Sequence, residues 1–367
     1  MNPVVVVGGG IVGTSVASHL ARRSVPVHLL EQNELGSGTS ADSMAVFVWQ
    51  QTRPDRTAHR LRQRSWDEYG RLVDEGTIDF ERTGTLHVAH TQAELDAYRA
   101  AAEELRAMDV PATIRTPEDL ADDGISFPSL AGGLYTPDDG YLDTAEIIQH
   151  FAAEARDAGA AVETGVEVTD VAVEDGSVTA VETTEGRVPA SAVVNAAGPW
   201  APFVDDLAGV SLPLRHNFGP ILVLQSETPL SLPFLEFEDG YYLRPEGDRQ
   251  VFAGRVGAAY EDASVVDPAH ARSIDHEYYL AVEERLAERF TSLPSLDVVN
   301  EWVGLRTVTP DGRPFVGRTD VDGFYVACGM SGYGVTLAPA VGQYLAALVD
   351  GDDVDDEFRA FFEPDRA

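Results

Sequence analysis

The sequence predicts an α/β fold in which a domain built on a parallel sheet is interleaved with an α+β domain built on a largely antiparallel sheet. Three observations lead to this prediction. A strand, a glycine turn, a helix and a second strand follow one another within residues 4–31, which makes one βαβ unit. Residues 210–266 instead carry several strands separated by the turns Asp239-Gly240 and Glu246-Gly247. Elements of the first kind then return near the end of the chain, at residues 324–348.

The chain length of 367 residues suits two domains. Because the parallel-sheet elements return late, we expect that domain to be discontinuous, comprising residues 1–80, 142–208 and 300–367. The antiparallel domain is then expected at residues 81–141 and 209–299.

Each element follows from a local pattern. Apolar β-branched runs predict strands at residues 4–7, 25–30, 83–88, 162–173, 178–183, 192–198 and 324–327. Helical periodicity predicts helices at 11–22, 56–75, 92–108, 145–158, 274–290 and 337–348. Asp143 or Thr144 could cap the fourth of these helices, and Gly159 would end it. The Pro- and Gly-containing stretch 127–141 reads as a loop, and the end of the acidic tail is expected to fray.

The charge balance is strongly acidic, with a formal net charge of −35. All 26 basic residues are arginines. Such a surface argues against binding to nucleic acid or anionic membranes. It is similar to the surfaces of proteins from salt-accumulating halophiles, and a dedicated cationic partner is the alternative. The absence of lysine excludes Schiff-base, pyridoxal-phosphate and P-loop lysine chemistry.

Location and metal binding are constrained less directly. No apolar run approaches the roughly 20 residues of a membrane span, and no basic segment precedes the first strand, so we expect a cytoplasmic protein. The lone cysteine, Cys328, cannot form an internal disulfide and reads as a core residue. The nine histidines show no metal-ligand spacing, so no metal site is predicted.

The first turn matches the G-x-G-x-x-G pattern of dinucleotide-binding βαβ units. Gly8 permits the tight turn, Gly10 lets the backbone approach a pyrophosphate, and Gly13 lets helix and strand pack closely. Glu31 ends the second strand, eighteen residues after Gly13, where an acid that binds ribose is expected. The alternative is that Glu31 is only a solvated surface acid. The pattern alone does not separate FAD from NAD.

Further motifs resemble the superfamily of D-amino-acid oxidase, glycine oxidase and sarcosine oxidase. They occur in the expected order over nearly the whole chain: the N-terminal glycine motif, Thr39-Ser40-Ala41-Asp42-Ser43, Val193-Val194-Asn195-Ala196-Ala197-Gly198-Pro199-Trp200, Tyr242-Leu243-Arg244-Pro245, Gly304-Leu305-Arg306, Thr309-Pro310-Asp311-Gly312 and Gly329-Met330-Ser331-Gly332-Tyr333-Gly334. The resemblance implies FAD, bound in a Rossmann-like domain interleaved with a substrate domain. The parallel-sheet segments would then form the FAD-binding domain.

The resemblance also implies a set of cofactor-binding residues. They are Gly8, Gly10, Ile11, Val12, Gly13, Glu31, Gln32, Thr39, Ser40, Ser43, Met44, Val168, Ala197, Gly198, Trp200, Gly332, Tyr333, Gly334, Val335 and Thr336. Covalent sarcosine oxidases attach flavin through a cysteine near the segment that corresponds to Gly304-Leu305-Arg306. No cysteine lies there in this chain, so we expect non-covalent FAD, with a histidine linkage left open.

The same resemblance implies oxidation of a small amino acid or N-methyl amino acid, of the glycine, sarcosine, D-amino-acid or proline type. Hydride would pass to flavin N5 and leave an imine that water hydrolyses. Arg306 is the candidate to grip the substrate carboxylate, and a structural arginine is the alternative. Tyr242 is the second candidate, whereas Tyr241 would face the other side of its strand. His216 is a weaker candidate for a base, a structural histidine being the more common case.

The sequence does not distinguish between several electron acceptors and several reaction classes. Sarcosine oxidases place over the flavin a lysine that this chain lacks, so oxygen, a quinone or an acceptor protein could each take the electrons. An oligomer is possible. The competing hypotheses are oxidation of a 2-hydroxy acid, a flavoprotein subunit that passes electrons to an acceptor other than oxygen, an NAD-dependent dehydrogenase and a protein that keeps FAD only as a structural group.

Overall fold

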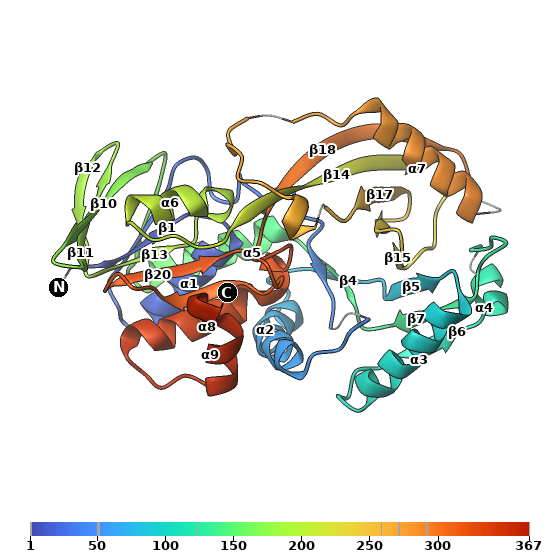
Figure 1. The fold of residues 1–367 in the computed structure, drawn as a ribbon, viewed down its shortest axis with the longest axis horizontal. Coiled ribbons are helices and arrows are strands. Elements are labelled where there is room, and N and C mark those ends of the chain that lie inside the picture. Colours follow the sequence, from blue (N-terminus) through green and yellow to red (C-terminus); the bar gives the residue numbers. More distant parts are fainter. Residues whose placement is uncertain are drawn as a thin grey trace.

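A six-stranded sheet organises the half of the molecule that holds both chain ends (Figure 1). The computed structural model describes residues 2–49, 52–122, 124–257, 259–270, 272–290 and 293–366. In sheet order the strands are β19 (Phe315–Arg318), β20 (Phe324–Cys328), β13 (Ala192–Asn195), β1 (Val4–Val7), β2 (Val27–Glu31) and β9 (Ala161–Thr164). Neighbours pair in parallel except β19, which runs antiparallel to β20.

Both faces of this sheet are covered, which explains why β1 is entirely apolar. Val4 and Val6 point to one side and Val5 and Val7 to the other, and each pair belongs to a different buried cluster. Three helices cover the first face: α1 (Ile11–Arg22), α5 (Thr144–Asp157) and α8 (Gly334–Asp350). The second face carries α6 (Ala201–Leu207) and a three-stranded sheet of β10 (Val168–Glu174), β11 (Ser177–Thr183) and β12 (Gly186–Pro189).

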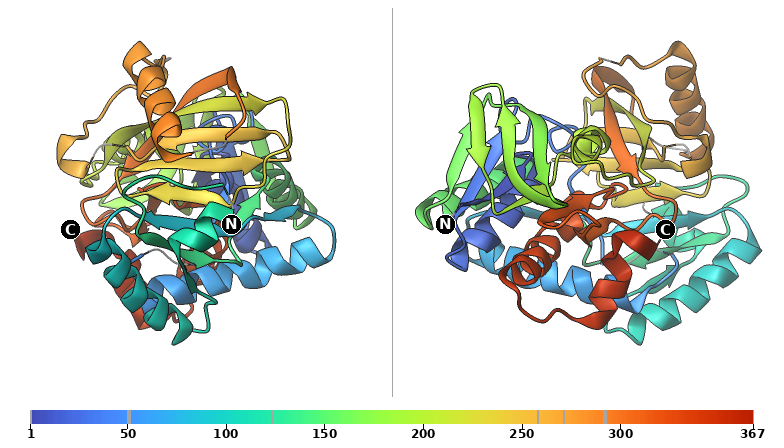
Figure 2. Two further views of the ribbon diagram at one scale, coloured as in Figure 1. Left: turned by 90° about the vertical axis from the view of Figure 1, so that its right-hand side faces the viewer. Right: turned by 60° about the vertical axis from the view of Figure 1, so that its left-hand side comes forward.

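The other half of the molecule is built on an eight-stranded sheet. Its strands, in order, are β18 (Leu296–Val308), β14 (Arg215–Ser226), β17 (Gln250–Arg255), β16 (Tyr241–Glu246), β15 (Phe234–Phe237), β5 (Thr85–Ala89), β7 (Gly132–Thr136) and β6 (Thr113–Arg115). The pairing is antiparallel except between β15 and β5. Figure 2 shows the yellow and orange strands of this sheet above its cyan strands.

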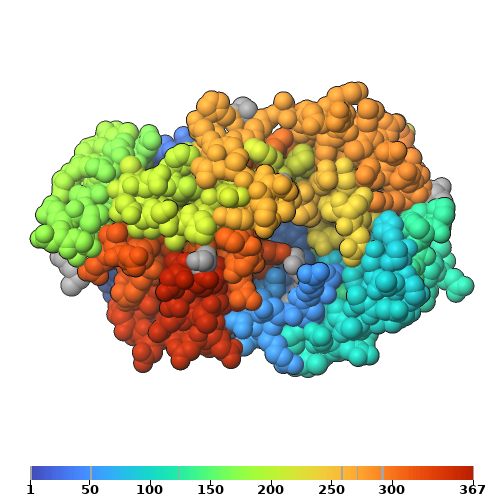
Figure 3. All heavy atoms as spheres, viewed as in Figure 1, coloured from blue at the N-terminus to red at the C-terminus, as the bar shows by residue number. Residues whose placement is uncertain are grey.

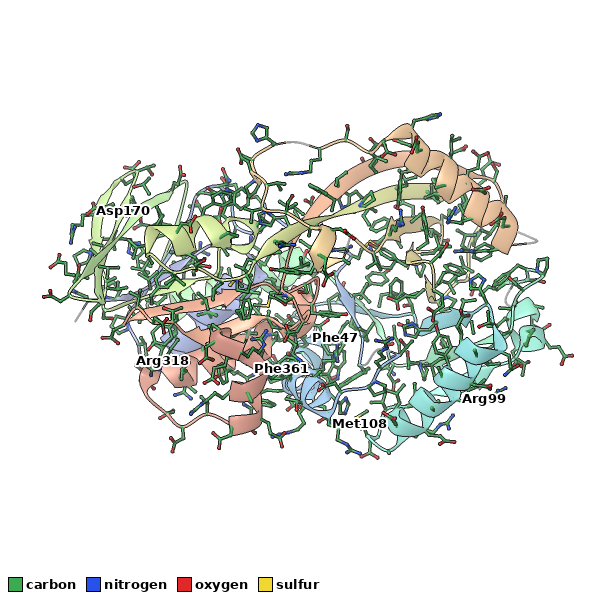
Figure 4. The ribbon with its side chains drawn as sticks, in the orientation of Figure 1. Phe47, Arg99, Met108, Asp170, Arg318 and Phe361 are labelled. Carbon is green, nitrogen blue, oxygen red and sulfur yellow. The ribbon has the colours of Figure 1, made fainter. Side chains whose placement is uncertain are left out.

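Helices α3 (Gln92–Arg106), α4 (Pro117–Asp122) and α7 (His276–Arg289) pack on the eight-stranded sheet. The cyan segment around α3 and the yellow-to-orange segment around α7 lie far apart in sequence, yet they share this half of the surface (Figure 3). A small sheet of β3 (Val46–Phe47), β8 (Gly140–Leu142) and β4 (Phe80–Arg82) lies between the halves, beside α2 (Arg56–Asp74). Phe47 from β3 is fully buried there and contacts Trp66 and Tyr69 of α2 (Figure 4).

The predicted fold class is confirmed, and each predicted helix is present with small shifts at its ends. Three parts of the prediction were wrong. The stretch 127–141 contains β7 and most of β8, because its glycines serve close strand pairing: a Cβ on Gly133 would lie 2.7 Å from the Leu86 side chain. Strand β18 was not predicted. It begins at Leu296, before the domain boundary proposed at residue 300, and pairs with β14 as far as Val308.

The third error concerns the acidic tail. Residues 356–362 form the helix α9, and Phe358, Phe361 and Phe362 are buried on its inner face. Asp355 caps this helix through its side chain and also pairs with Arg60 on α2. Three aromatic side chains at helical spacing outweigh the acidic composition of the tail, and the final turns are therefore anchored rather than frayed.

Candidate active site

A cavity of about 700 Å³ connects the two halves. Its first end lies at the carboxyl ends of β1, β2, β13 and β20, and its second end lies against the face of the eight-stranded sheet. Ligands of open α/β sheets bind at the carboxyl edge of the strands, so the first end is where a dinucleotide is expected. Every predicted cofactor residue lines this cavity except Gly13.

The glycine turn has the geometry that its sequence predicts. Gly8 has a φ of +108°, and a Cβ on it would lie 2.5 Å from the carbonyl oxygen of Ala196. A Cβ on Gly13 would clash with the carbonyl oxygen of Gly8, so Gly13 serves the packing of α1 against β1 beneath the cavity. A Cβ on Gly10 would meet only the Ser40 hydroxyl, at 3.3 Å, so the backbone there is open to a ligand.

Glu31 is held in position by the backbone around it. Its Oε2 accepts a hydrogen bond from Gly9 N at 2.6 Å, and its Oε1 accepts one from Asn33 N at 2.8 Å. The carboxylate still lines the cavity at the end of β2, next to Gln32. A solvated surface acid would lack these bonds, so the geometry favours a fixed acceptor for ribose hydroxyls.

The predicted hydroxyl residues mainly shape the cavity wall. Thr39 Oγ1 donates to Leu305 O at 2.6 Å, and Thr336 Oγ1 donates to Val46 O at 3.2 Å. Ser43 Oγ accepts from Ala45 N at 3.0 Å, and Ser40 Oγ accepts from Ile11 N, the first residue of α1, at 3.2 Å. Only Ser40 therefore lies at the helix N-terminus that would face a pyrophosphate.

The remaining predicted residues line the cavity from three further segments. Met44 belongs to the apolar wall, while Val168, Ala197, Gly198 and Trp200 come from β10 and from the turn after β13. Gly332 to Thr336 form the turn and first residues of α8, whose start has no side-chain cap. Gly332 has a φ of +93°, and a Cβ built on it would lie 3.7 Å from Arg306 Cδ, so this turn contacts Arg306 directly.

Arg306 and Tyr242 meet at the second end of the cavity. Arg306 Nη2 donates to the Tyr242 hydroxyl at 3.1 Å, although the two side chains come from strands β18 and β16. Burial raises the pKa of the Tyr242 phenol despite the opposing effect of the nearby guanidinium. The phenol therefore stays a hydrogen-bond donor. Tyr241 points to the opposite face and stacks on Tyr278, as the strand alternation predicts.

Two glycines make room for this pair. A Cβ on Gly219 would lie 2.6 Å from Arg306 Nη2, and a Cβ on Gly254 would clash with the Tyr242 ring. Both glycines lie on the strands between β18 and β16, namely β14 and β17. The two polar side chains thus lie flat over a sheet surface without side chains, which fixes their direction. No local pattern in the sequence indicates this role of Gly219 and Gly254, because it depends on strand order.

Strand β18 also connects the second end of the cavity, at Arg306, to the first end, where the dinucleotide is expected. Leu305 O accepts the Thr39 bond, Thr307 Oγ1 donates to Gly198 O at 3.1 Å, and Thr307 O accepts from Ser331 N at 3.0 Å. The residues on either side of Arg306 are thereby bonded to three cofactor-lining segments.

His216 is not among the residues that line the cavity. Its Nε2 lies 2.8 Å from Pro199 O, and its Nδ1 accepts a hydrogen bond from Val266 N at 3.1 Å. Burial lowers the pKa of this imidazole, and both nitrogens are bonded to backbone. We therefore assign His216 a structural role and no longer a catalytic one.

Glu236 and Asp42 are further cavity residues that the sequence analysis did not single out as functional. Glu236 lies directly opposite Tyr242 in the ladder between β15 and β16. The Asp239-Gly240 turn signal could have suggested that pairing. Cys328 also lines the cavity, and its burial raises the pKa of the thiol, which opposes thiolate chemistry. Among the described residues, no cluster of metal ligands is found, and no helix is long and apolar enough to cross a membrane.

A parallel sheet with a dinucleotide turn, sharing its cavity with an arginine–tyrosine pair on a second sheet, defines a dinucleotide-dependent oxidoreductase of two interleaved domains. The chain belongs to the DAO family of FAD-dependent oxidoreductases, whose family model matches residues 3–348. FAD, and not NAD, is therefore the cofactor of this cavity. The glycine turn, the held Glu31 and the open backbone at Gly10 fit its ADP portion.

Individual relatives agree with this assignment. The chain is 28% identical over 93% of its length to human mitochondrial dimethylglycine dehydrogenase, of which it covers 42%. It is 26% identical over 95% of its length to glycine oxidase from Geobacillus kaustophilus, of which it covers 92%. The crystal structure of that oxidase matches with a TM-score of 0.87, at 25% identity and 99% and 98% coverage of the two chains. The chain thus spans about two fifths of the mitochondrial relative's length.

Proposed function

We propose that this protein oxidises a small amino acid or N-methyl amino acid, using FAD that it binds without a covalent link. The proposal rests mainly on the contact between Arg306 and Tyr242 at the end of the cavity opposite Glu31. Two donors that converge on one point, one of them a planar cation, suit a substrate carboxylate. When bound, FAD supplies the acceptor for the hydride of the substrate C–H bond.

The protein contributes position and environment to this reaction. The Arg306 guanidinium binds the carboxylate and the Tyr242 hydroxyl donates a second hydrogen bond, which orients the adjacent C–H bond. The apolar walls formed by Ile221, Phe234 and Met44 keep water from the reacting carbon. The imine product then leaves the cavity and is hydrolysed by water.

The names of the relatives support small substrates. They include glycine oxidase, dimethylglycine dehydrogenase and a 4-methylaminobutanoate oxidase from Paenarthrobacter nicotinovorans, to which the chain is 30% identical over 94% of its length. The acceptor of the electrons is oxygen, a quinone or an acceptor protein. With no lysine in the chain to promote reaction with oxygen, we favour slow reoxidation by air.

Non-covalent binding rests on the absence of cysteine from residues 304–306 and on the raised pKa of the Cys328 thiol. We further propose a cytoplasmic protein adapted to high salt. The net charge of −35 supports the adaptation to high salt, since dissolved ions screen repulsion among the carboxylates. A melting temperature that rises with salt between about 0.1 and 2 M would agree with it, and an unchanged melting temperature would contradict it.

The direct test is an anaerobic visible spectrum in high salt, titrated with glycine, sarcosine, L-proline and D-amino acids. Bleaching of the flavin band by one of them supports the proposal, and readmitting air then separates oxidase from dehydrogenase. Bleaching only by 2-hydroxy acids would replace amine oxidation with hydroxy-acid oxidation, since the same donors would hold that carboxylate. A flavin that none of these compounds bleaches would indicate a structural cofactor.

A further inference from the structure

The substrate end of the cavity contains a carboxylate that the proposed reaction does not use. Glu236 lines the cavity from β15, together with Phe234 and Tyr242. Its surroundings are otherwise largely apolar, since Ile221, Phe234 and Tyr242 form one buried cluster. A carboxylate beside such a wall is costly unless a partner compensates its charge.

The register of the sheet fixes the direction of this carboxylate. Glu236 is paired with Tyr242 on one side and with His87 of β5 on the other. Directly opposed residues share a face of the sheet, so all three point to the same side. The row continues through Gly254 to Ile221, which also lines the cavity.

One oxygen of Glu236 is anchored from behind. His87 Nδ1 lies 2.8 Å from Glu236 Oε2, and His87 is buried. Burial alone would lower the pKa of this imidazole, but Glu236, together with Asp139 and Glu238, outweighs that effect and the pKa is raised. Among the described residues, the other oxygen, Oε1, has no hydrogen bond, and the side chain keeps 34% of its surface exposed. The anchor thus leaves one oxygen available.

The cavity therefore has a cation and an anion at its substrate end. The cation is Arg306 and the anion is Glu236. Tyr242 lies between them, because its backbone is paired with Glu236 and its hydroxyl accepts a hydrogen bond from Arg306. Asp42 is another acid that lines the cavity. It lies against Gly304, where the Gly304 Cβ position is 3.3 Å from Asp42 Cβ, and burial raises its pKa toward the neutral form.

We propose that Glu236 binds the cationic nitrogen of the substrate, while Arg306 and Tyr242 bind its carboxylate. This inference rests on the proposed amino-acid oxidation and adds to it a selection rule. The cavity accepts compounds with both charges and rejects the 2-hydroxy and alkoxy acids that carry the same carboxylate. His87 acts as a positioning residue for the acid.

Matched pairs of ligands test this selection directly. Methoxyacetate differs from sarcosine only by oxygen in place of the cationic nitrogen, and 4-methoxybutanoate differs in the same way from 4-methylaminobutanoate. Dissociation constants are measured on the FAD-loaded protein from the shift of the flavin spectrum, under anaerobic conditions and at fixed salt. For ligands that reduce the flavin, the constant comes from the concentration dependence of the reduction rate.

The wild-type protein should bind the charged member of at least one pair more tightly than the uncharged member. Glu236→Gln should lower that preference about tenfold, which is the lower end of what the loss of a charge-assisted hydrogen bond costs, because the site is partly exposed. Gln can keep an oxygen near His87, so the fold should persist. Glu236→Asp keeps the charge and should keep most of the preference. Glu238→Gln is the matched control, because Glu238 bonds to Tyr98 and does not line the cavity.

Three results would overturn the inference. The first is an unchanged preference in Glu236→Gln, even if sarcosine still bleaches the flavin. The second is a loss of preference in Asp42→Asn instead. The third is a wild-type protein that binds both members of every pair equally. If no carboxylate of either kind binds, the proposed function fails together with the inference.

Discussion

Substituting Gly219 by alanine should weaken substrate binding by displacing the Arg306 side chain, without replacing any residue that binds the substrate. The new Cβ would lie 2.6 Å from Arg306 Nη2 and 3.0 Å from its Cζ. Ordinary contact distances of about 3.5 Å require the guanidinium to move by roughly 1 Å. A shift of that size at a clamp costs up to about 100-fold, so we expect kcat/KM to fall by roughly 10- to 100-fold.

The expected fall concerns the clamp and not the fold. Gly219 has ordinary strand geometry, and its crowded neighbour is the end of a flexible side chain, so the melting temperature and FAD content should be unchanged. Steady-state kinetics with the substrate found by flavin bleaching, together with a thermal melt, measure both quantities. Gly304→Ala is the control: Gly304 pairs with Gly219 across β14 and β18, but its Cβ position is nearest Asp42. If Gly219→Ala keeps the wild-type KM, Arg306 does not hold the carboxylate.

Three further predictions concern the cofactor and the fold. Glu31→Gln should raise the dissociation constant for FAD about tenfold in a fluorescence titration, because a charged acceptor for ribose is lost; unaltered affinity would argue against that role. Phe362→Ala should reduce the free energy of unfolding by about 3 kcal/mol in urea, since the ring is fully buried against Tyr344; a loss below about 1 kcal/mol would mean that α9 contributes little. Burial raises the pKa of Asp205 to about 7, so the folded protein holds this proton more tightly than the unfolded chain, and stability should fall as pH rises from about 4 to 7. Asp205→Asn should remove on the order of 2 kcal/mol of that fall. Urea unfolding at pH 4.5 and pH 8 measures it, and an equal loss of unfolding free energy between the two pH values in the wild type and the variant would refute the prediction.

The glycine turn of the cofactor half was predictable because its signals are local. Gly8, Gly10, Gly13 and Glu31 lie within one βαβ unit, and the chemistry of each follows from its place in that unit. The substrate half depends on which strands become neighbours. Gly219, Gly254 and Glu236 acquire their roles only through the strand order β18-β14-β17-β16-β15, which no local pattern reports.

The same distinction explains the errors outside the site. Strand β18 is exposed over most of its first half and buried in its second, so it shows no single alternation along its 13 residues. His216 was considered because histidine can act as a base, whereas its two backbone partners, Pro199 and Val266, lie 17 and 50 residues away. Such long-range bonds distinguish a structural histidine from a catalytic one only after folding.

The bonds along β18 have a consequence for how this protein can change its substrate. Leu305 and Thr307 tie the strand to Thr39, Gly198 and Ser331, so a shift of its backbone would disturb the flavin site as well. These bonds therefore hold the proposed carboxylate-binding position of Arg306 together with the cofactor-lining segments. The residues of β15 and β5, at the far side of Tyr242 and all within the described part of the chain, make no hydrogen bond to these three residues, so we expect substitutions there to disturb the cofactor-lining segments less than substitutions in β18.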